Sequence, residues 1–268
     1  MTAGASTSPP CRVCGEPTCT LFSKRVLNHL DVGYHQCATC GFTQTDEPTW
    51  LDEAYASPIA SIDTGLLARN LHARRVSAVF LHLAGVGTRA CLDWAGGYGV
   101  FTRLMRDIGF DFRWQDPYCE NLMARGFEWD AAQGAPFACT AFEVLEHLPR
   151  PVEGFRELAS LGAEYIITST QLYAGEQPAA DWFYLAPESG QHVAFYRRDT
   201  IERLGTECGY PFVLTTSSMQ LFARNRLPTW AWVAAQLPGT PLYPLVRRAR
   251  PSLTDSDSTR LRGQIGTP

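Results

Sequence analysis

The stretch Cys91-Leu92-Asp93-Trp94-Ala95-Gly96-Gly97-Tyr98-Gly99 lies where a short apolar strand is expected to end and a helix to begin. Glycines let the backbone turn sharply and approach a ligand closely, and the following helix offers unpaired N–H groups. Asp116, at the end of the next expected strand, follows Asp93 by 23 residues and can accept hydrogen bonds from both hydroxyls of a ribose. These residues indicate a nucleotide site, although a tight structural turn would also account for the glycines.

The details of this stretch favour one kind of nucleotide. A dinucleotide site has the pattern G-x-G-x-x-G, and here Gly97 and Gly99 are followed by Thr102 where the last glycine belongs. The acidic Asp93 would repel a pyrophosphate but would suit an ammonium group. S-adenosylmethionine carries an amino group and a sulfonium but no phosphate, so the stretch favours S-adenosylmethionine over NAD.

Strand-like and helix-like segments alternate on both sides of this stretch. Such alternation predicts an α/β fold, in which helices cover both faces of a Rossmann-like, doubly wound, mostly parallel sheet. The last two strands are joined by a short Thr/Ser turn and predict an antiparallel edge. The expected helices are 63–84, 100–108, 151–161 and 198–208, and the expected strands are 90–94, 111–115, 137–142, 165–169, 212–216 and 219–223.

Four segments together resemble the class I S-adenosylmethionine-dependent methyltransferases. They are the glycine-rich stretch, Trp114-Gln115-Asp116-Pro117-Tyr118, Ala141-Phe142-Glu143-Val144-Leu145-Glu146-His147-Leu148 and Gln191-His192-Val193-Ala194-Phe195-Tyr196. The resemblance spans residues 60–225 and implies S-adenosylmethionine as cofactor, held by Asp93, Ala95, Gly96, Gly97, Gly99, Asp116, Pro117, Phe142 and Glu143. Ala95 stands where the family usually has glycine, a departure that is tolerated if φ at this position is negative.

Four cysteines near the N-terminus form two pairs, Cys11-x-x-Cys14 and Cys37-x-x-Cys40, each followed by a glycine. Two residues between cysteines let both thiolates face one ion, and two such pairs supply the closed Cys₄ set of a structural zinc site. A redox pair or incidental thiols are the alternatives, and Cys19 is expected not to bind the ion. This part of the chain also resembles sugar-modifying methyltransferases that carry an N-terminal zinc-binding module.

Glu143, Glu146 and His147 follow an expected strand whose end faces the ligand in sheets of this type. On a helix their spacing would put all three near one face, and together with His192 they could hold Mg²⁺ or Mn²⁺. The E-x-x-E-H pattern with a later histidine is similar to metal-assisted 2′-O-methyltransferases of small RNA and to ubiquinone-pathway O-methyltransferases. Without a metal, His147 or His192 is the expected general base, and the carboxylates pack the site or contact the cofactor.

Trp182, Phe183 and Tyr184 are consecutive aromatic residues in the segment before His192. They could stack on a sugar ring or another flat acceptor. They could equally anchor the segment to the core.

These segments predict a domain organisation. We expect a disordered lead over 1–10, a Cys₄ zinc-binding module over 11–45, a linker over 46–62, the methyltransferase domain over 63–226 and a partly disordered extension over 227–268. The extension ends with five arginines against two aspartates. It is read as a loosely attached helix with a disordered end, and the alternative is a basic contact to a membrane surface or a partner.

Composition excludes several classes of protein. With 45% hydrophobic and 19% charged residues, the chain is neither wholly disordered nor fibrous. Its net charge of −4 makes nucleic acid an unlikely partner, and no apolar run is long enough for a transmembrane segment. Nine cysteines in a chain that starts without a secretory signal predict a cytoplasmic protein.

The expected function is methyl transfer from S-adenosylmethionine to a hydroxyl of a sugar, glycan or other hydroxylated small molecule, with or without a metal. A C- or N-methyltransferase of a deoxysugar or natural product is one alternative. An RNA methyltransferase is another, against which the lack of a basic channel counts. A non-catalytic cofactor-binding scaffold is a third, and it would not need Asp93, Gly97, Gly99 and Asp116 intact.

Overall fold

The structure is a computed structural model that describes residues 8–57, 59–60, 62–226 and 228–265. The chain divides into two compact units, each built from several stretches of sequence. Unit 1 comprises residues 1–62, 143–160 and 168–220, and unit 2 comprises residues 63–142, 161–167 and 221–268. The expected disordered lead falls largely on residues 1–7, which lie outside the described part of the chain.

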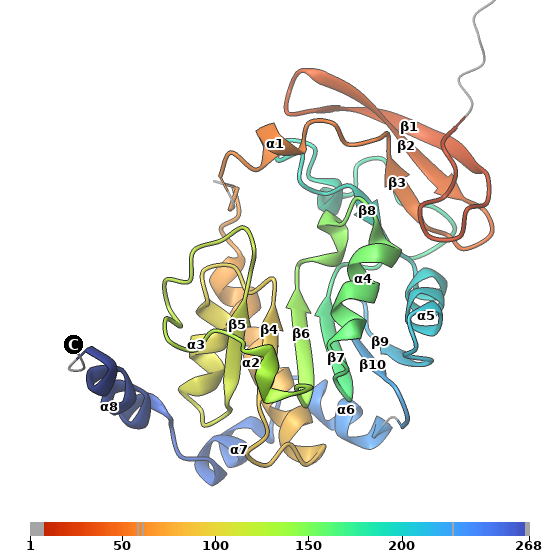
Figure 1. Ribbon diagram of the computed structural model, residues 1–268. Coiled ribbons are helices and arrows are strands. Elements are labelled where there is room, and N and C mark those ends of the chain that lie inside the picture. The colour runs from red at the N-terminus through yellow and green to blue at the C-terminus, as the bar shows by residue number, and fades with distance from the viewer. Residues whose placement is uncertain (1–7, 58, 61, 227, 266–268) are drawn as a thin grey trace, which may run out of the picture. The chain divides into compact units, whose positions relative to one another are not determined.

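A six-stranded sheet in the order β5-β4-β6-β7-β10-β9 carries the α/β fold (Figure 1). Its strands are β4 (Cys91–Trp94), β5 (Phe112–Gln115), β6 (Ala138–Phe142), β7 (Tyr165–Ser169), β9 (Phe212–Thr215) and β10 (Met219–Ala223). β4 pairs in parallel with both β5 and β6. In the turn that joins β9 to β10, the Thr216 N–H donates to the Met219 carbonyl at 2.8 Å. The predicted mostly parallel α/β sheet, with the two closing strands at one edge, is confirmed.

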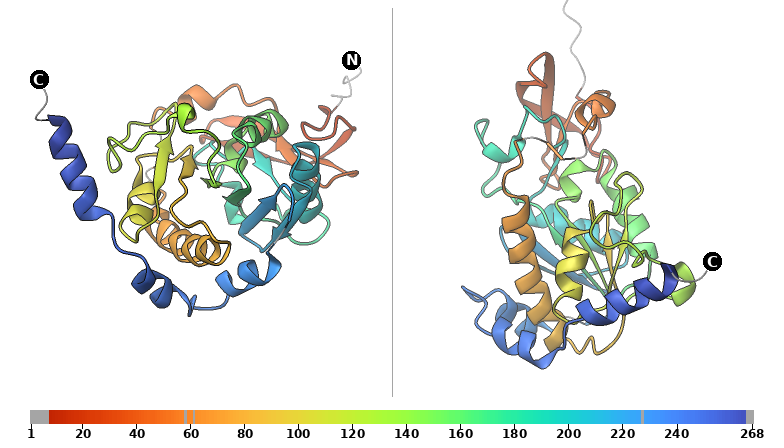
Figure 2. Two further views of the ribbon diagram at one scale, coloured as in Figure 1. Left: turned by 60° about the horizontal axis from the view of Figure 1, so that its bottom comes forward. Right: turned by 90° about the vertical axis from the view of Figure 1, so that its left-hand side faces the viewer.

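Helix α2 (Leu66–Leu83) is the centre of helix packing in unit 2, because it contacts three other helices. These are α3 (Val100–Arg106), α6 (Thr229–Ala235) and α7 (Tyr243–Ala249), and Figure 2 shows α6 and α7 following one another beside α2. Residues at helical spacing on α2, such as Val76 and Phe80, are fully buried. The Phe80 ring packs edge-on against Trp232 of α6, with ring centroids 5.8 Å apart.

Helix α8 (Thr254–Ile265) is fastened to α3 by a buried ion pair. The Asp257 carboxylate accepts from Arg106 Nη2 at 2.6 Å and from Arg103 Nη1 at 2.8 Å, and the side chains of Asp257 and Arg106 are 7% and 5% exposed. Where the sequence predicts a single helix, the described part of the extension therefore contains α6, α7 and α8. Unit 2 also contains the 3₁₀ turn η1 (Ala131–Gln133).

Unit 1 contains a four-stranded sheet in the order β1-β2-β3-β8. Its strands are β1 (Thr18–Val26), β2 (Leu30–Cys37), β3 (Thr43–Thr45) and β8 (Ala194–Phe195). The helices and 3₁₀ turns of the unit are α1 (Leu51–Ala54), η2 (Leu145–His147), α4 (Pro151–Ser160), η3 (Phe183–Leu185) and α5 (Arg198–Glu207), and strand β9 of the large sheet also belongs to it. One face of the small sheet packs Tyr34 and Phe195 into a hydrophobic core that also contains Trp50 and Tyr184. The segments 1–62 and 168–220 thus share one core.

The predicted helices 63–84, 100–108, 151–161 and 198–208 correspond to α2, α3, α4 and α5. The predicted strands correspond to the six strands of the large sheet, and β7 and β10 agree residue for residue. The β1–β2 hairpin and β8 were not predicted. No helix among the described residues is long and apolar enough to cross a bilayer.

Candidate functional site

The glycine-rich loop and Asp116, both in unit 2, leave the large sheet side by side. β4 and β5 are in parallel register, with Trp94 opposite Gln115, so the chain leaves both strands at the same edge. The Gly97 N–H donates to Asp116 Oδ2 at 2.9 Å, and the N–H groups of Tyr118 and Cys119 donate to Oδ1 at 2.8 and 2.9 Å. The carboxylate predicted to hold a ribose therefore also fixes the loop in place.

Asp93 supports the loop from inside the protein. Its carboxylate is buried and accepts from the hydroxyls of Thr102 at 3.0 Å and Thr140 at 2.9 Å. Burial raises the pKa of Asp93 to about 7, and the two hydroxyl donors only partly oppose this rise. Thr102, which occupies the position of the third glycine in dinucleotide sites, is thus a hydrogen-bond donor to Asp93.

The backbone of the loop turns through three left-handed residues. Ala95 has φ +53°, Gly97 has φ +53° and Gly99 has φ +81°. The negative φ under which alanine would be tolerated at position 95 is therefore not found, because the chain turns as sharply here as at the glycines. A Cβ on Gly96 would meet Asp93 Oδ2 at 2.8 Å, whereas a Cβ on Gly97 would point into open space. The loop therefore packs onto Asp93 on one side and leaves room beside Gly97.

The other cofactor residues implied by the resemblance lie near the carboxyl ends of strands. Pro117 is exposed directly after Asp116, and Phe142 ends β6 with its ring 4.7 Å from the ring of Phe101. Glu143 belongs to unit 1 and lies outside the helical turn on which it was expected.

Glu143 does not lie on a helix with Glu146 and His147. It has φ +53°, which turns the chain sharply after β6, and Ser169 Oγ donates to its carboxylate at 2.7 Å. The helical turn that follows, η2, begins only at Leu145 and is a 3₁₀ turn. The expectation that three side chains share one helix face was therefore wrong, because Glu143 is outside the helical turn.

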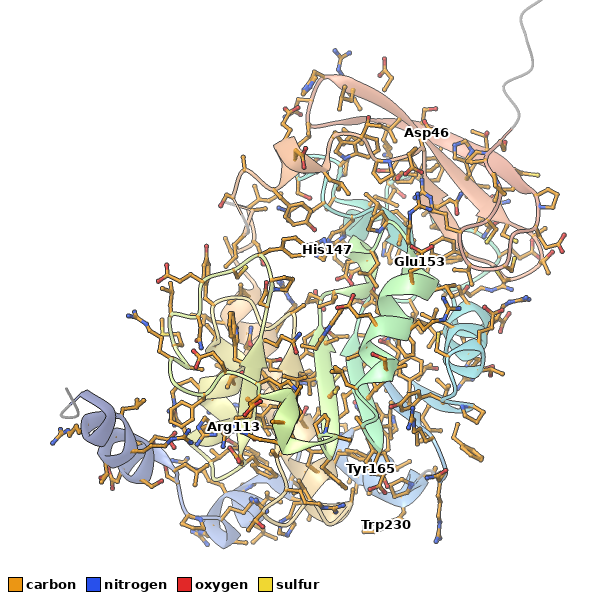
Figure 3. The ribbon with its side chains drawn as sticks, viewed as in Figure 1. Asp46, Arg113, His147, Glu153, Tyr165 and Trp230 are labelled. Carbon is orange, nitrogen blue, oxygen red and sulfur yellow. The ribbon has the colours of Figure 1, made fainter. Side chains whose placement is uncertain are left out.

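Glu146, His147 and His192 are brought together in unit 1, and one potential ligand atom of each lies within 4.8 Å of the others. Glu146 is fully buried, and the Tyr184 hydroxyl donates a hydrogen bond to its Oε1. Burial and the nearby Glu146 carboxylate raise the pKa of Tyr184 well above its ordinary value, which keeps that hydroxyl protonated. Figure 3 labels His147 on the segment between β6 and α4.

Both histidines are held in the same way. His147 Nδ1 lies 3.0 Å from the Gln191 carbonyl, and His192 Nδ1 lies 2.6 Å from the Tyr184 carbonyl. A carbonyl only accepts, so each Nδ1 carries a proton and donates it to that carbonyl. The rings meet edge to face with centroids 4.9 Å apart. Two imidazole rings and one buried carboxylate therefore share one small region.

The aromatic residues before His192 differ in burial. Tyr184 is buried and Trp182 is partly buried against the core, whereas Phe183 is 77% exposed. Tyr184 also packs against the His192 ring, with centroids 4.6 Å apart. Tyr184 was predicted only as an aromatic residue. Its hydrogen bond to Glu146 was not predicted, and neither were the contacts that Gln191 and Ser169 make with His147 and Glu143. The signal available in the sequence was the place of Tyr184 and Gln191 in the segment that contains His192.

The four cysteines predicted to bind zinc form one cluster in unit 1. The sulfur of Cys40 lies 3.6 Å from those of Cys11 and Cys14, and Cys14 lies 3.4 Å from Cys37. Each pair closes the same turn, because the N–H groups of the two following glycines donate to the carbonyls of Cys11 and Cys37. Cys19 is exposed and outside the cluster.

Comparison with known proteins gives one family. A profile described as a methyltransferase domain matches residues 67–215, more than half of the chain. No curated protein matches the sequence.

Several solved structures are similar to this chain. Magnesium protoporphyrin IX methyltransferase from Synechocystis PCC 6803 is 15% identical, with a TM-score of 0.43 over 67% of this chain and 93% of that one. Human N-acetylserotonin methyltransferase is 10% identical, with a TM-score of 0.43 over 66% of each chain. For mitomycin 7-O-methyltransferase the identity is 14%, the TM-score 0.42 and the coverage 65% of this chain and 59% of that one.

Proposed function

Because the chain belongs to the methyltransferase domain family, we propose that it methylates a hydroxyl group of a sugar, glycan or other hydroxylated small molecule, with S-adenosylmethionine as donor. The observation that carries the choice of an oxygen acceptor is the pair of histidines beside Glu146, each held through Nδ1 by a backbone carbonyl.

The residues of unit 2 fit S-adenosylmethionine. Asp116 supplies a partly exposed carboxylate for the ribose hydroxyls, and the open space beside Gly97 admits a ligand next to it. The loop 93–99 contains no basic side chain, which suits a cationic ligand better than a phosphate. When bound, the cofactor supplies an electrophilic methyl group on its sulfonium sulfur. Asp93 acts on the loop, since its carboxylate is buried beneath Gly96.

The acceptor hydroxyl must lose its proton as the methyl group arrives. An imidazole whose Nδ1–H is bound to a carbonyl is oriented to take up that proton at Nε2. We assign this role to His147 and His192, with Glu146 favouring the cationic form of the ring that accepts the proton. The same three residues would hold Mg²⁺ or Mn²⁺, which would supply Lewis acidity toward the hydroxyl oxygen.

The donor set favours a cation over a lone base. One imidazole suffices for proton transfer, yet two are held in the same way around a carboxylate. Metal-binding histidines usually donate their other ring N–H to a carbonyl or carboxylate, and both histidines here do so.

We also propose that Cys11, Cys14, Cys37 and Cys40 bind one structural zinc ion. A tetrahedron with Zn–S bonds of about 2.3 Å has S–S edges of about 3.8 Å, and the sulfur–sulfur separations of 3.4–3.6 Å in the structure are close to that length. Elemental analysis of protein purified without chelators should find about one zinc per chain, and Cys37→Ser should lower that content. An absence of zinc would contradict this assignment.

The enzymatic proposal is tested by label transfer from methyl-labelled S-adenosylmethionine. The acceptors are sugar nucleotides, oligosaccharides, catechols and short RNA, each with added Mg²⁺ and with EDTA. We expect label on a hydroxylated small molecule, lost with EDTA and with His192→Ala. The matched control is His29→Ala, because His29 is exposed and outside the cluster. Label that survives EDTA would leave histidine as the base without a metal, and label on RNA alone would contradict the proposed acceptor.

A further inference from the structure

Two stretches of unit 2 contain no acidic side chain. Residues 64–92 hold four arginines and residues 221–253 hold five, and neither stretch contains an aspartate or glutamate. In a chain with 27 acidic and 23 basic residues, such segregation is marked. The first stretch includes α2 and the second includes α6 and α7, and these three helices pack together. Positive charge is therefore concentrated on one helical layer of unit 2.

The same helices expose large apolar side chains. On α6, Ala231, Trp232 and Ala235 are buried, and Trp230 and Val233 on the other side of the helix are 63% and 56% exposed. Leu237, just beyond the helix, is 45% exposed, and Leu245 of α7 is 60% exposed. Both helices bury their other face against α2, so these four residues point away from the core. An exposed tryptophan among aliphatic residues marks a contact surface.

Arginines flank the apolar residues. Arg247 and Arg248 follow Leu245 by two and three residues, are exposed, and form no ion pair with any residue of the described chain. Other arginines of the layer are neutralised, since Arg69 pairs with Asp63 at 2.7 Å and Arg89 with Glu164 at 3.5 Å. We call Trp230, Val233, Leu237, Leu245, Arg247 and Arg248 the α6–α7 surface.

We propose that the α6–α7 surface attaches the protein to the surface of an anionic phospholipid membrane. Tryptophan and aliphatic side chains suit the boundary between lipid headgroups and acyl chains, and unpaired arginines suit negatively charged headgroups. This attachment is separate from methyl transfer and does not rest on it.

The charge and the apolar side chains of the α6–α7 surface argue against a second copy of the chain or a nucleic acid as its partner. A symmetric contact with a second copy would bring arginines of the same sign together around only four apolar side chains, a small patch beside a stable dimer interface. Nucleic acid would satisfy the arginines but would leave Trp230, Val233 and Leu237 against phosphates. An anionic bilayer satisfies both kinds of side chain.

The position of the surface is compatible with cofactor binding in unit 2. Figure 1 shows α6 and α7 at the end of β4 and β5 opposite to the glycine-rich loop, and Trp230 is labelled at that end in Figure 3. A membrane at the α6–α7 surface would therefore leave the loop and Asp116 free.

The test is co-sedimentation of the full chain with vesicles of phosphatidylcholine, alone or with about one-third phosphatidylglycerol. We expect binding to the anionic vesicles only, weakening as salt rises. Each basic residue near such a surface strengthens binding about five-fold, so Arg247→Glu with Arg248→Glu should weaken it by about 25-fold or more. Trp230→Ser with Val233→Ser should also release the protein, and circular dichroism would verify that each variant is folded.

The matched control is Arg125→Glu with Arg262→Glu, which changes the net charge equally at exposed positions outside the surface. An equal loss by this control would show that only net charge matters and would overturn the proposal. Equal binding to neutral and anionic vesicles, or binding to neither, would also overturn it. A dimer in sedimentation velocity that Trp230→Ser dissociates would assign the surface to a second copy instead.

Discussion

Replacing Tyr184 by phenylalanine removes one hydroxyl from the Glu146 cluster and leaves the ring in place. That hydroxyl donates to Glu146 Oε1 and lies 3.3 Å from Thr170 Oγ1. Glu146 is fully buried, so water cannot replace the lost donor without rearrangement of the core. The substitution therefore changes the orientation and the charge stabilisation of one proposed cation ligand and spares both histidines.

The size of the effect follows from the type of bond. A hydrogen bond to a charged group contributes about 1.5–3 kcal/mol, which corresponds to about 10- to 150-fold in an equilibrium constant. Loss of a residue that orients a metal ligand costs about 10- to 100-fold in metal affinity. We therefore expect Tyr184→Phe to weaken Mn²⁺ binding by about 10- to 100-fold and to lower the free energy of unfolding by about 1.5–3 kcal/mol.

Mn²⁺ binding is measured by electron paramagnetic resonance, which needs no methyl acceptor. The matched control is Tyr34→Phe, because Tyr34 is equally buried and its hydroxyl has no hydrogen-bond partner among the described residues. The control should bind Mn²⁺ as the unmodified protein does. If Tyr184→Phe also binds Mn²⁺ normally while folded, the hydroxyl does not support a cation ligand. If the unmodified protein binds no Mn²⁺, the cluster serves as a histidine base.

Three further substitutions have defined outcomes. Asp116→Ala should weaken S-adenosylmethionine binding at least about ten-fold in calorimetry, because it removes a charged hydrogen-bond acceptor, and unchanged affinity would refute its ribose role. Ala95→Gly should raise the free energy of unfolding, measured in urea, by about 1 kcal/mol, because a left-handed φ strains alanine. A lower free energy of unfolding would show that Ala95 is not strained. Asp257→Ala should lower the free energy of unfolding by about 3 kcal/mol, because Arg106 stays buried without its main partner. Although burial raises the pKa of Asp257, hydrogen bonds from Arg106 and Arg103 outweigh it and hold that pKa below its ordinary value. The ion pair should thus stabilise the protein fully above about pH 4 and progressively less below it, which unfolding at several pH values will check.

The large sheet could be predicted because its strands are short apolar runs bounded by turn residues. Strands β7 (Tyr165–Ser169) and β10 (Met219–Ala223) are buried on both faces over nearly their whole length. Their sequences are therefore mostly apolar, and their few polar residues are uncharged Thr, Ser and Gln. The helices between them show the spacing of one buried face. Fold class follows from such local patterns, which need no knowledge of distant contacts.

The β1–β2 hairpin was missed because its turn has no glycine. Leu27 and Asn28 occupy the turn with φ +49° and +64°, where Asn-Gly or Gly-Gly would be expected. β8 is two residues long and pairs with β3 across about 150 residues of sequence, so no local pattern announces it. The hairpin and β8 are both held by one hydrophobic core, to which β2 contributes Tyr34 and β8 contributes Phe195.

The backbone at the candidate site departs from sequence rules in the same way twice. Ala95 follows β4 and Glu143 follows β6, and each is a non-glycine residue with φ +53°. Such residues cost energy and persist where surrounding contacts hold them. The Glu143 N–H bonds to the Ser169 carbonyl at 3.1 Å and its carboxylate to the Ser169 hydroxyl, so two contacts fix its turn. From sequence alone, a non-glycine residue is expected to have a negative φ, because contacts with distant residues such as Ser169 are not visible in the local sequence.

The arrangement of the two histidines bears on the acceptor. We infer that a cation held by Glu146, His147 and His192 would keep coordination positions open, since three protein ligands do not complete the shell of Mg²⁺ or Mn²⁺. Two adjacent hydroxyls of one molecule can fill two such positions, and the cation would then lower the pKa of the hydroxyl to be methylated. A lone hydroxyl gains less, because it binds through a single oxygen. A requirement for vicinal hydroxyls, tested by comparing an acceptor with its single-deoxy analogue in the presence of Mg²⁺, would therefore separate a metal-assisted enzyme from one that uses a histidine base alone.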